Sequence, residues 1–530
     1  MIYALKLLVV VFTVGCIAQY LFRNAFRDIF SPVEYKRAWT LLLLGVVASY
    51  LCKLPVVFLV VVAVIAIYGA NAVGRGPAGK VAVFLLMVVA LPPIRLSLGG
   101  FGSINYVLSL DPPRVLALVL LGWAAIELAG MKPVPRAMRF FWIDIFVVGY
   151  QVLRIALVMP HSTFTTLARL LVETTLDILL PYFVVTRSLR SLADLRFAAG
   201  HLLVGLAFAA SVGVAELALQ HNLYSGLQTI YDMRWQLTYV LMRGGMIRVQ
   251  SDTPQPIILA FMMLFGIGLW YWLLNAQWRR PAVAALFATF TLTLVATFSR
   301  GPWLAAGLIM VALFAMRRMS VSVFRIFLIV AVLAAVGLKL GNADTAVMSS
   351  LSALFGSSET DISSIEYRRQ LLDTSLALIK QSPWLGVPNY AAQMQALKQG
   401  EGIIDLVNSY LAIMLDAGII GLALYLFPFL MVIHRLLSAL RQREESGVEK
   451  RSRFAMAMIA LTIGCLFAIF TASSWGIMPL LLTLLLAFSM AWLGMSPEER
   501  NSSEVSVEVE DPVQTARRLA HQLSIGARVS

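Results

Sequence analysis

Apolar runs of about 17 residues or more recur along almost the whole chain, and this is the length that a helix needs to cross the hydrocarbon core of a membrane. Of the 530 residues, 60% are hydrophobic and 13% are charged. A soluble domain has a charged fraction of about 25%, so these residues cannot supply the polar surface of a soluble fold. The sequence therefore predicts an all-α protein, a polytopic transmembrane helical bundle of about 12 to 15 spans.

The apolar runs also divide the chain into segments. The expected spans are 3–21, 39–52, 55–72, 81–97, 114–130, 140–159, 169–186, 197–219, 256–274, 281–298, 302–316, 324–340, 409–433, 454–472 and 476–494. The resulting division is 1–219 (N-terminal transmembrane helices), 220–255 (periplasmic loop), 256–340 (transmembrane helices with a Ser-Arg-Gly turn), 341–408 (large periplasmic loop with an amphipathic helix), 409–495 (C-terminal transmembrane helices) and 496–530 (disordered cytoplasmic tail).

Positive charges in the short connections set the orientation. Lys and Arg gather in connections that share one side, at 23–37, 75–80, 132–139, 187–196, 279–280, 317–325 and 435–453. The positive-inside rule makes this side cytoplasmic. The two long loops, 220–255 and 341–408, then face the periplasm or the cell exterior.

The formal net charge of +14 does not indicate a nucleic-acid-binding protein, because no Lys/Arg cluster alternates with aromatic residues on a soluble face. The segment 74–80 is close to a nucleotide phosphate loop, but Val81 stands where Ser or Thr would hold magnesium. The five histidines never pair at zinc-ligand spacing. We therefore expect no metal, no cofactor and no nucleic acid.

Arginines near the outer membrane face are the strongest candidates for chemistry. Arg300, in Ser-Arg-Gly-Pro-Trp, joins two spans just before a helix begins, where a guanidinium and a helix N-terminus together favour an anion. The alternative is an arginine that reaches to lipid phosphate. Arg243 and Arg248 lie in the first long loop, and Arg248 comes shortly before a span.

The second long loop contains Glu366, Arg368 and Arg369. From 365 to 379, residues Leu371, Leu372, Ser375, Leu376 and Ile379 recur at helical spacing, which predicts an amphipathic helix along the membrane surface. For each of the two arginines, a surface salt bridge and a ligand contact remain equally open.

Several segments together resemble the O-antigen ligase/polymerase family of bacterial envelope biogenesis (Wzy-type polysaccharide polymerases). They are Ser299-Arg300-Gly301 between spans, Arg368 ahead of a Pro383-x-x-Gly386 turn, Asn408-Ser-Tyr-Leu411, and Asp416-Ala-Gly418-x-x-Gly421. The resemblance extends over 240–425, and Arg248 looks like the family's arginine that closes the earlier outer loop. It implies a metal-independent glycosyltransferase of the bacterial inner (cytoplasmic) membrane, which uses sugars linked to undecaprenyl pyrophosphate at the periplasmic face.

This chemistry suits the candidate residues. A pyrophosphate-activated sugar already has a good leaving group, so the enzyme needs cations to neutralise it. We expect Arg300, Arg248 and Arg368 in that role, with Glu366 or Asp405 as the base for the attacking hydroxyl. The substrate-binding candidates are Arg369, Arg243, Asn408 and Tyr410.

Three functions remain open. Family ligases typically have a histidine where this chain has Val407, which favours a polymerase of exopolysaccharide or O-antigen repeat units over a ligase that transfers glycan to lipid A-core. Acidic residues inside spans (Asp144, Glu173, Asp177 and Glu216) keep a transporter or flippase of lipid-linked sugars as the non-enzyme alternative. These residues could instead pair with Arg154 or Arg169, or form a polar network that holds helices together. A lipid bilayer, a flippase and a chain-length regulator are the partners that the resemblance implies.

Overall fold

The computed structural model describes residues 2–99, 106–131, 141–231, 240–243, 245–316, 359–398, 404, 406–445, 452–496 and 499–500. In these residues almost every element is a helix, and eight helices are long and apolar enough to cross a membrane. Four shorter apolar helices accompany them. The predicted fold class, a polytopic helical bundle, is confirmed. The expected span 324–340 and most of the expected tail lie outside the described residues.

The helices form in chain order as the apolar runs predict, and prolines often stand in the first turn, where a missing N–H costs nothing. Helices in the first half are α1 (Ile2–Phe22), α2 (Pro32–Leu51), α3 (Pro55–Val73), α4 (Gly76–Val88), α5 (Pro112–Leu116), α6 (Gly122–Gly130), α7 (Phe141–Val158), α8 (Phe164–Thr174), α9 (Leu180–Ser188), α10 (Leu192–Leu219) and α11 (Leu227–Tyr231). Helices in the second half are α12 (Pro256–Leu274), α13 (Pro281–Ala296), α14 (Arg300–Ala315), α17 (Glu359–Gln381), α18 (Tyr390–Gln393), α19 (Ser409–Glu445), α20 (Arg453–Phe470) and α21 (Met478–Gly494).

Short irregular elements complete the fold. Two π-helical turns, η1 (Ala117–Leu121) and η4 (Thr175–Leu179), join α5 to α6 and α8 to α9. The 3-10 turns are η3 (Met159–His161), η5 (Asn275–Gln277) and η6 (Gln395–Leu397). Strand β1 (Leu96–Gly99) pairs antiparallel with β2 (Tyr106–Leu110), with Leu96 opposite Leu110, and β3 (Met242–Arg243) pairs with β4 (Met246–Ile247).

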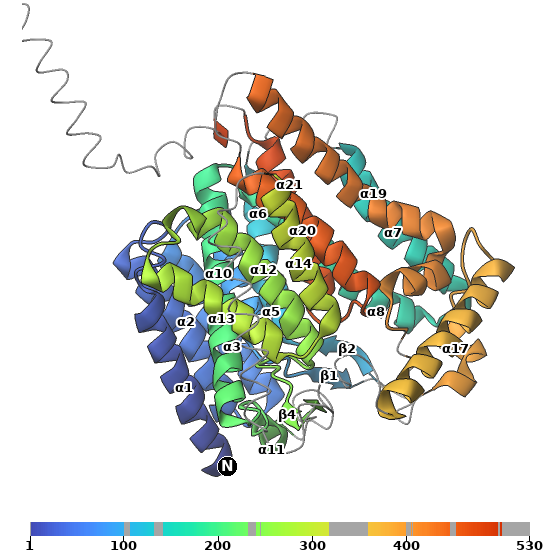
Figure 1. Cartoon of the computed structure of the whole chain (residues 1–530), viewed down its shortest axis with the longest axis horizontal. Coiled ribbons are helices and arrows are strands. Elements are labelled where there is room, and N and C mark those ends of the chain that lie inside the picture. Colours follow the sequence, from blue (N-terminus) through green and yellow to red (C-terminus); the bar gives the residue numbers. More distant parts are fainter. Residues whose placement is uncertain are drawn as a thin grey trace, which may run out of the picture.

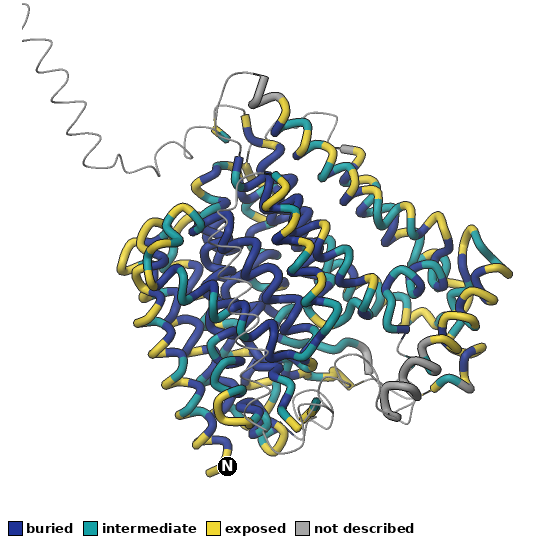
Figure 2. The backbone as a smooth tube through the Cα atoms, in the orientation of Figure 1, coloured by how far each residue is buried: buried dark blue, intermediate teal, exposed yellow. Residues whose placement is uncertain are grey.

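Helix α12 occupies the centre of the bundle, where nearly all of its residues are buried, and it packs against α10, α13 and α20. Figure 1 shows α7 and α19 side by side on one flank of this bundle, with α17 beyond them. Buried residues concentrate in the central helices, whereas the α7 and α19 flank is mostly intermediate or exposed (Figure 2). The flank therefore contacts the main bundle less extensively than the central helices contact one another.

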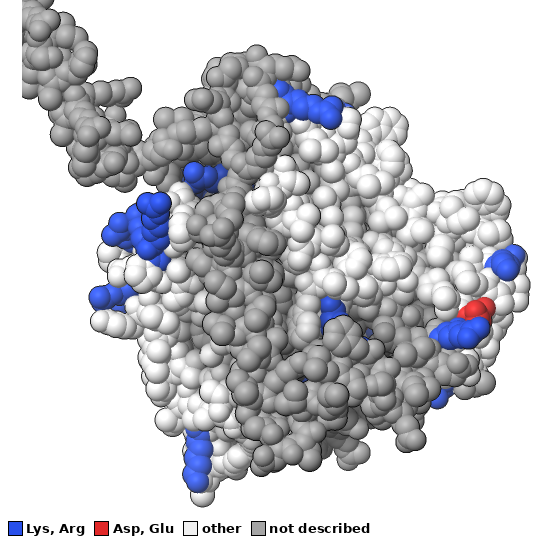
Figure 3. Space-filling view, viewed as in Figure 1, with Lys and Arg blue, Asp and Glu red and all other residues white. Residues whose placement is uncertain are grey.

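The bundle has two chemically different ends. At one, which we call the basic end, Arg280 pairs with Asp28, and Arg75 lies 3.4 Å from Glu34. At the other, the loop end, the Tyr50 hydroxyl donates to the Leu223 carbonyl at 2.8 Å. A group of Lys and Arg side chains gathers at the upper left of Figure 3, near the basic end, and the white surface below it is largely uncharged. The predicted grouping of the connections 23–37, 75–80 and 279–280 on one side agrees with these contacts.

Two sequence expectations differ from the structure. The expected span 81–97 is helical only to Val88, because Pro92 and Pro93 stop the helix, and β1 follows. Glu173 and Asp177, which were expected inside a span, pair with neither Arg154 nor Arg169 but with Arg114, at 2.9 Å each. A third acidic residue, Asp144, pairs with Arg187 at 3.0 Å. The structural-network interpretation of these carboxylates is therefore correct, although its arginines were not the expected ones.

The amphipathic helix of the second loop is present as α17. Its buried face comprises Leu371, Ser375, Leu378 and Ile379. The three apolar residues of this face belong to one hydrophobic cluster with Leu411 and Leu415 of α19. Two residues expected on that face, Leu372 and Leu376, are instead exposed. Leu378 is buried in the cluster with α19, whereas Leu372 and Leu376 remain on the surface. The apolar surface of α17 therefore extends beyond its buried face.

Candidate functional site

Two arginines hold the turn between α13 and α14 at the loop end. Arg248 donates from Nε to the Thr297 carbonyl at 2.9 Å and from a terminal nitrogen to the Ser299 hydroxyl at 3.0 Å. Arg243, on strand β3, donates to the Phe298 carbonyl at 3.1 Å. Arg300 follows Ser299 directly and begins α14. The structure thus brings three predicted arginines to one turn, which we call the arginine turn (297–300).

The arginine turn is suited to an anion. Burial, together with the nearby charge of Arg243, lowers the pKa of Arg248 to about 10, so this guanidinium remains charged at neutral pH. The Ser299 side chain makes no capping hydrogen bond to the first turn of α14, because its hydroxyl is engaged with Arg248 and Thr297. The helix N-terminus and the cations therefore favour negative charge at the same place.

A short connection links the arginine turn to the start of α19. Gly301 lies against Thr471 so closely that a Cβ there would overlap the threonine side chain. Three residues on, the Ser474 N–H donates to the Ser409 hydroxyl at 2.7 Å, and that hydroxyl donates to the Ala472 carbonyl at 2.8 Å. The segment 471–474 thus joins two motifs that are more than 100 positions apart in the chain.

Strained backbone concentrates beside these residues. In the described part of the chain, non-glycine residues with positive φ are Gln220, Ser251, Phe298 and Val407. Ser251 directly precedes Asp252, Phe298 precedes Ser299, and Val407 precedes Asn408. Positive φ is costly for side chains such as Val and Phe, and strain of this kind is typical of functional sites.

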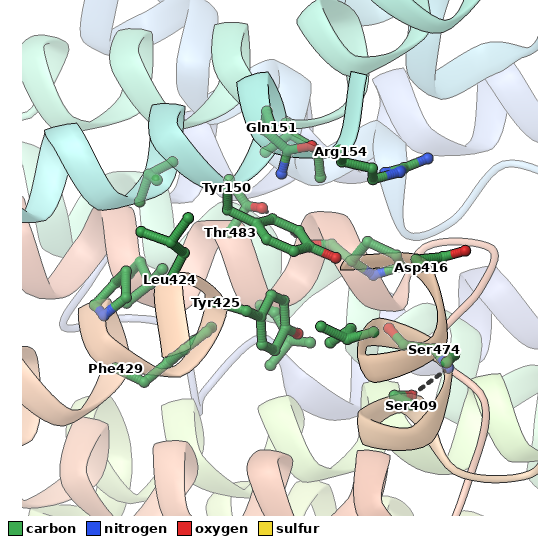
Figure 4. A pocket seen from close by; sticks show the side chains of 18 of the residues that line it. Tyr150, Gln151, Arg154, Ser409, Asp416, Leu424, Tyr425, Phe429, Ser474 and Thr483 are labelled. Atoms are coloured by element: carbon green, nitrogen blue, oxygen red, sulfur yellow. Dashed lines mark hydrogen bonds between the residues drawn. The ribbon is translucent and has the colours of Figure 1, made fainter. Parts of the chain in front are cut away.

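Two adjoining cavities lie beside the segment 473–479. The first, which we call the tyrosine cavity, has a volume of about 300 Å³ and is lined by Tyr150, Tyr425 and Ser409. Figure 4 shows Arg154 of α7 and Asp416 of α19 at the same side of it. The second, the Asp252 cavity, measures about 380 Å³. Both are lined by Arg154, Ile178, Ser474 and Pro479, so they share a wall next to the connection 471–474.

Glu216 organises the loops around the Asp252 cavity. This fully buried carboxylate, at the end of α10, accepts backbone N–H groups from Leu223 at 3.0 Å, Gln250 at 3.0 Å and Ser251 at 2.8 Å. It therefore fixes the segment that runs from Arg248 to Asp252. Glu216 thus has a positioning role in the loop end.

The remaining predicted site residues have varied surroundings. Asn408 caps α19, with its Oδ1 accepting the Tyr410 N–H at 2.9 Å, and the Tyr410 hydroxyl donates to the Leu466 carbonyl at 2.7 Å. Arg369 is exposed on α17. Arg368 and Glu366 belong to the same helix, but their side chains, like Asp405 as a whole, lie outside the described residues. The roles of all these residues in binding or catalysis stay predictions.

Sequence reasoning missed Asp252 and the positioning role of Glu216. Asp252 lies in the segment 249–254, which follows Arg248 and precedes a span. Its charge so close to an apolar run was the sequence signal that could have marked it as a candidate site residue. The hydrogen bonds of Glu216 join positions up to 35 apart, which a sequence pattern cannot indicate. Among the described residues, no three His, Cys, Asp or Glu side chains are placed to bind one metal ion.

Comparison with known proteins identifies one segment. Residues 284–426 match the family model described as O-antigen ligase. The matched segment contains the arginine turn, α17 and the first half of α19, and it supports the family resemblance found in the sequence. No curated protein matches the chain.

Proposed function

We propose that this protein is a membrane glycosyltransferase that acts on glycans linked to undecaprenyl pyrophosphate, because residues 284–426 match the family model described as O-antigen ligase. The observation that carries the proposal is the arginine turn, where Arg243, Arg248 and Arg300 meet the N-terminus of α14. A departing pyrophosphate is the anion that such a site would neutralise. The loop end is then the periplasmic end of an inner-membrane protein, since the Lys and Arg of the basic end favour the cytoplasm.

We favour polymerisation of repeat units over ligation to lipid A-core. Val407 occupies the position before Asn408, where family ligases typically have a histidine. The ion pairs of Glu173, Asp177 and Asp144 argue against the transporter alternative, because charges held in ion pairs between helices serve the packing of the bundle. A flippase and a chain-length regulator remain the proposed partners.

Turnover of a purified undecaprenyl-pyrophosphate oligosaccharide by the protein in liposomes tests this function. We expect products that grow by whole repeat units. Arg300→Ala should lower the rate by about 100-fold or more, as for other groups that stabilise transition-state charge. Arg300→Lys should also be impaired, because a point charge does not replace a bidentate fork.

Arg27→Ala, at the exposed basic end, is the matched control and should behave like the wild type. A single transfer to an added acceptor would indicate a ligase instead. Normal rates from both Arg300 variants would remove the arginine turn from the mechanism.

A further inference from the structure

Resting on the proposed function, we infer that the Asp252 cavity binds the acceptor sugar and that Asp252 is the base that removes the proton from its attacking hydroxyl. The cavity is bounded by the segment 252–254 of the first outer loop and by the connection 474–477. Its volume of about 380 Å³ falls within the range of small-molecule sites.

The carboxylates that line this cavity have different hydrogen-bonding states. Glu173 and Asp177 hold Arg114 in ion pairs, and Asp111 accepts the Arg114 N–H at 3.2 Å as the N-cap of α5. Asp252 is only 4% exposed, and its Oδ1 is buried with no hydrogen-bond partner. A buried carboxylate oxygen without a partner is costly, so a ligand hydroxyl at this position would restore the missing hydrogen bond.

Asp252 is connected to the arginine turn through Arg248, which lies four positions earlier in the same segment. Arg248 is hydrogen-bonded to residues 297 and 299, and the Ser251 N–H is held by Glu216. Three residues separate Arg248 from Asp252, so both ends of this segment are fixed. Ser251 keeps a φ of 52°, a strained conformation that sets the direction of the following side chain. A base and one of the cations for the leaving group, Arg248, are thereby held on one rigid segment.

The reaction balances with these groups. The O–H bond of the acceptor breaks, and its proton goes to Oδ1 of Asp252. The acceptor oxygen forms a bond to the anomeric carbon of the donor sugar. The bond from that carbon to the pyrophosphate oxygen breaks, and its electron pair leaves with the pyrophosphate, which the arginine turn neutralises.

Burial favours a base that works near neutral pH. Desolvation, with a smaller contribution from Glu216, raises the pKa of Asp252 to about 7. Glu216 of α10 and Tyr224 of the preceding loop interact with it electrostatically. The charged groups on the other walls of the cavity are Arg95, Asp111, Arg114, Arg154, Glu173 and Asp177. A base must be deprotonated to act, so activity should be full above this pKa and fall as the pH decreases through about 7.

The test compares Asp252→Asn with the wild type in liposomes that contain the lipid-linked oligosaccharide. We expect kcat to fall by about 100-fold or more, with KM for the donor and the amount of protein in the membrane unchanged. The wild-type kcat/KM should decline below about pH 7, and the residual activity of Asp252→Asn should lack that decline. Asp28→Asn, the same change at the basic end, should keep wild-type kinetics.

The outcomes separate this inference from the proposed function. A wild type that transfers glycan and an Asp252→Asn variant with the same rate and pH profile would overturn the base role alone. A variant that loses donor binding or protein level together with activity would make Asp252 structural and overturn it too. Absence of transfer by the wild type would reject the proposed function itself.

Discussion

At the scale of single residues, the loop end depends on a few buried polar groups that accept or donate several hydrogen bonds at once. Glu216 joins the loop after α10 to the segment before α12 through three backbone N–H groups. Arg248 similarly joins that segment to the arginine turn. The site is therefore a chain of contacts, in which α10 positions Arg248 and Arg248 positions the start of α14.

Replacing Glu216 with Ala should destabilise the protein and lower its activity together. Each buried donor that loses its partner costs about 1–3 kcal/mol, and three donors are involved. We expect a lower melting temperature in detergent, measured by tryptophan fluorescence, and a reduced kcat for glycan transfer.

Glu34→Ala is the control for this change. Glu34 belongs to a capping box at the exposed basic end, so its loss should cost only about 1 kcal/mol and leave transfer intact. Unchanged stability and activity of Glu216→Ala would contradict the positioning role of that residue.

Sequence reasoning at this scale identified individual residues better than it identified their partners. Arg243, Arg248 and Arg300 could be selected because cations near spans stand out against an apolar background. Their convergence could not be foreseen, because Arg248 contacts a turn 49 positions away. The same limit applies to Glu173, whose partner, Arg114, is 59 positions earlier and in another helix.

At the scale of elements, two motifs that are distant in sequence form one joint. The turn Pro383-x-x-Gly386 lies against the break in α19 at Gly418, where the Ile419 N–H donates to the Pro383 carbonyl at 2.9 Å. Both glycines have positive φ, and a Cβ on either one would overlap the backbone of the other segment. This joint fixes where α17 lies and where Asp416 enters the tyrosine cavity.

Gly418→Ala should break the joint. Gly418 has φ 65° and ψ −164°, a region that is essentially restricted to glycine and costs other residues about 1–3 kcal/mol. The added methyl group would also overlap the Trp384 carbonyl. We expect faster proteolysis of the segment 359–398 in membranes and loss of glycan transfer.

Gly307→Ala on α14 is the matched control for Gly418→Ala, because a Cβ there meets nothing within 4 Å and alanine favours a helix. It should leave both readouts unchanged. Wild-type proteolysis and transfer in Gly418→Ala would show that the joint is dispensable.

The sequence located the elements well, because a span requires an apolar run and nearly every expected run in the described residues became a helix. It was less successful at their ends. In the 81–97 run, Pro92 and Pro93 outweighed the hydropathy of the neighbouring residues. It also placed Leu372 and Leu376 on the buried face of α17, where both are exposed, whereas Leu371, Ser375 and Ile379 are buried as expected.

At the scale of the whole molecule, the proposed function requires the loop end to face the compartment in which lipid-linked glycans are presented. Gln228 and Asn24 allow a direct test, because both are polar, uncharged and exposed, at the loop end and the basic end respectively. Cys16 and Cys52 would first be changed to Ser, and Cys465 is buried.

With a membrane-impermeant maleimide on spheroplasts, we expect Gln228→Cys to react at once and Asn24→Cys to react only after the membrane is permeabilised. The reason is the positive-inside rule, which assigns the connections around Asn24 to the cytoplasm. The opposite pattern would place the arginine turn and Asp252 in the cytosol, away from any periplasmic donor. That result would exclude both the pyrophosphate site and the acceptor cavity, however well their geometry suits the reaction.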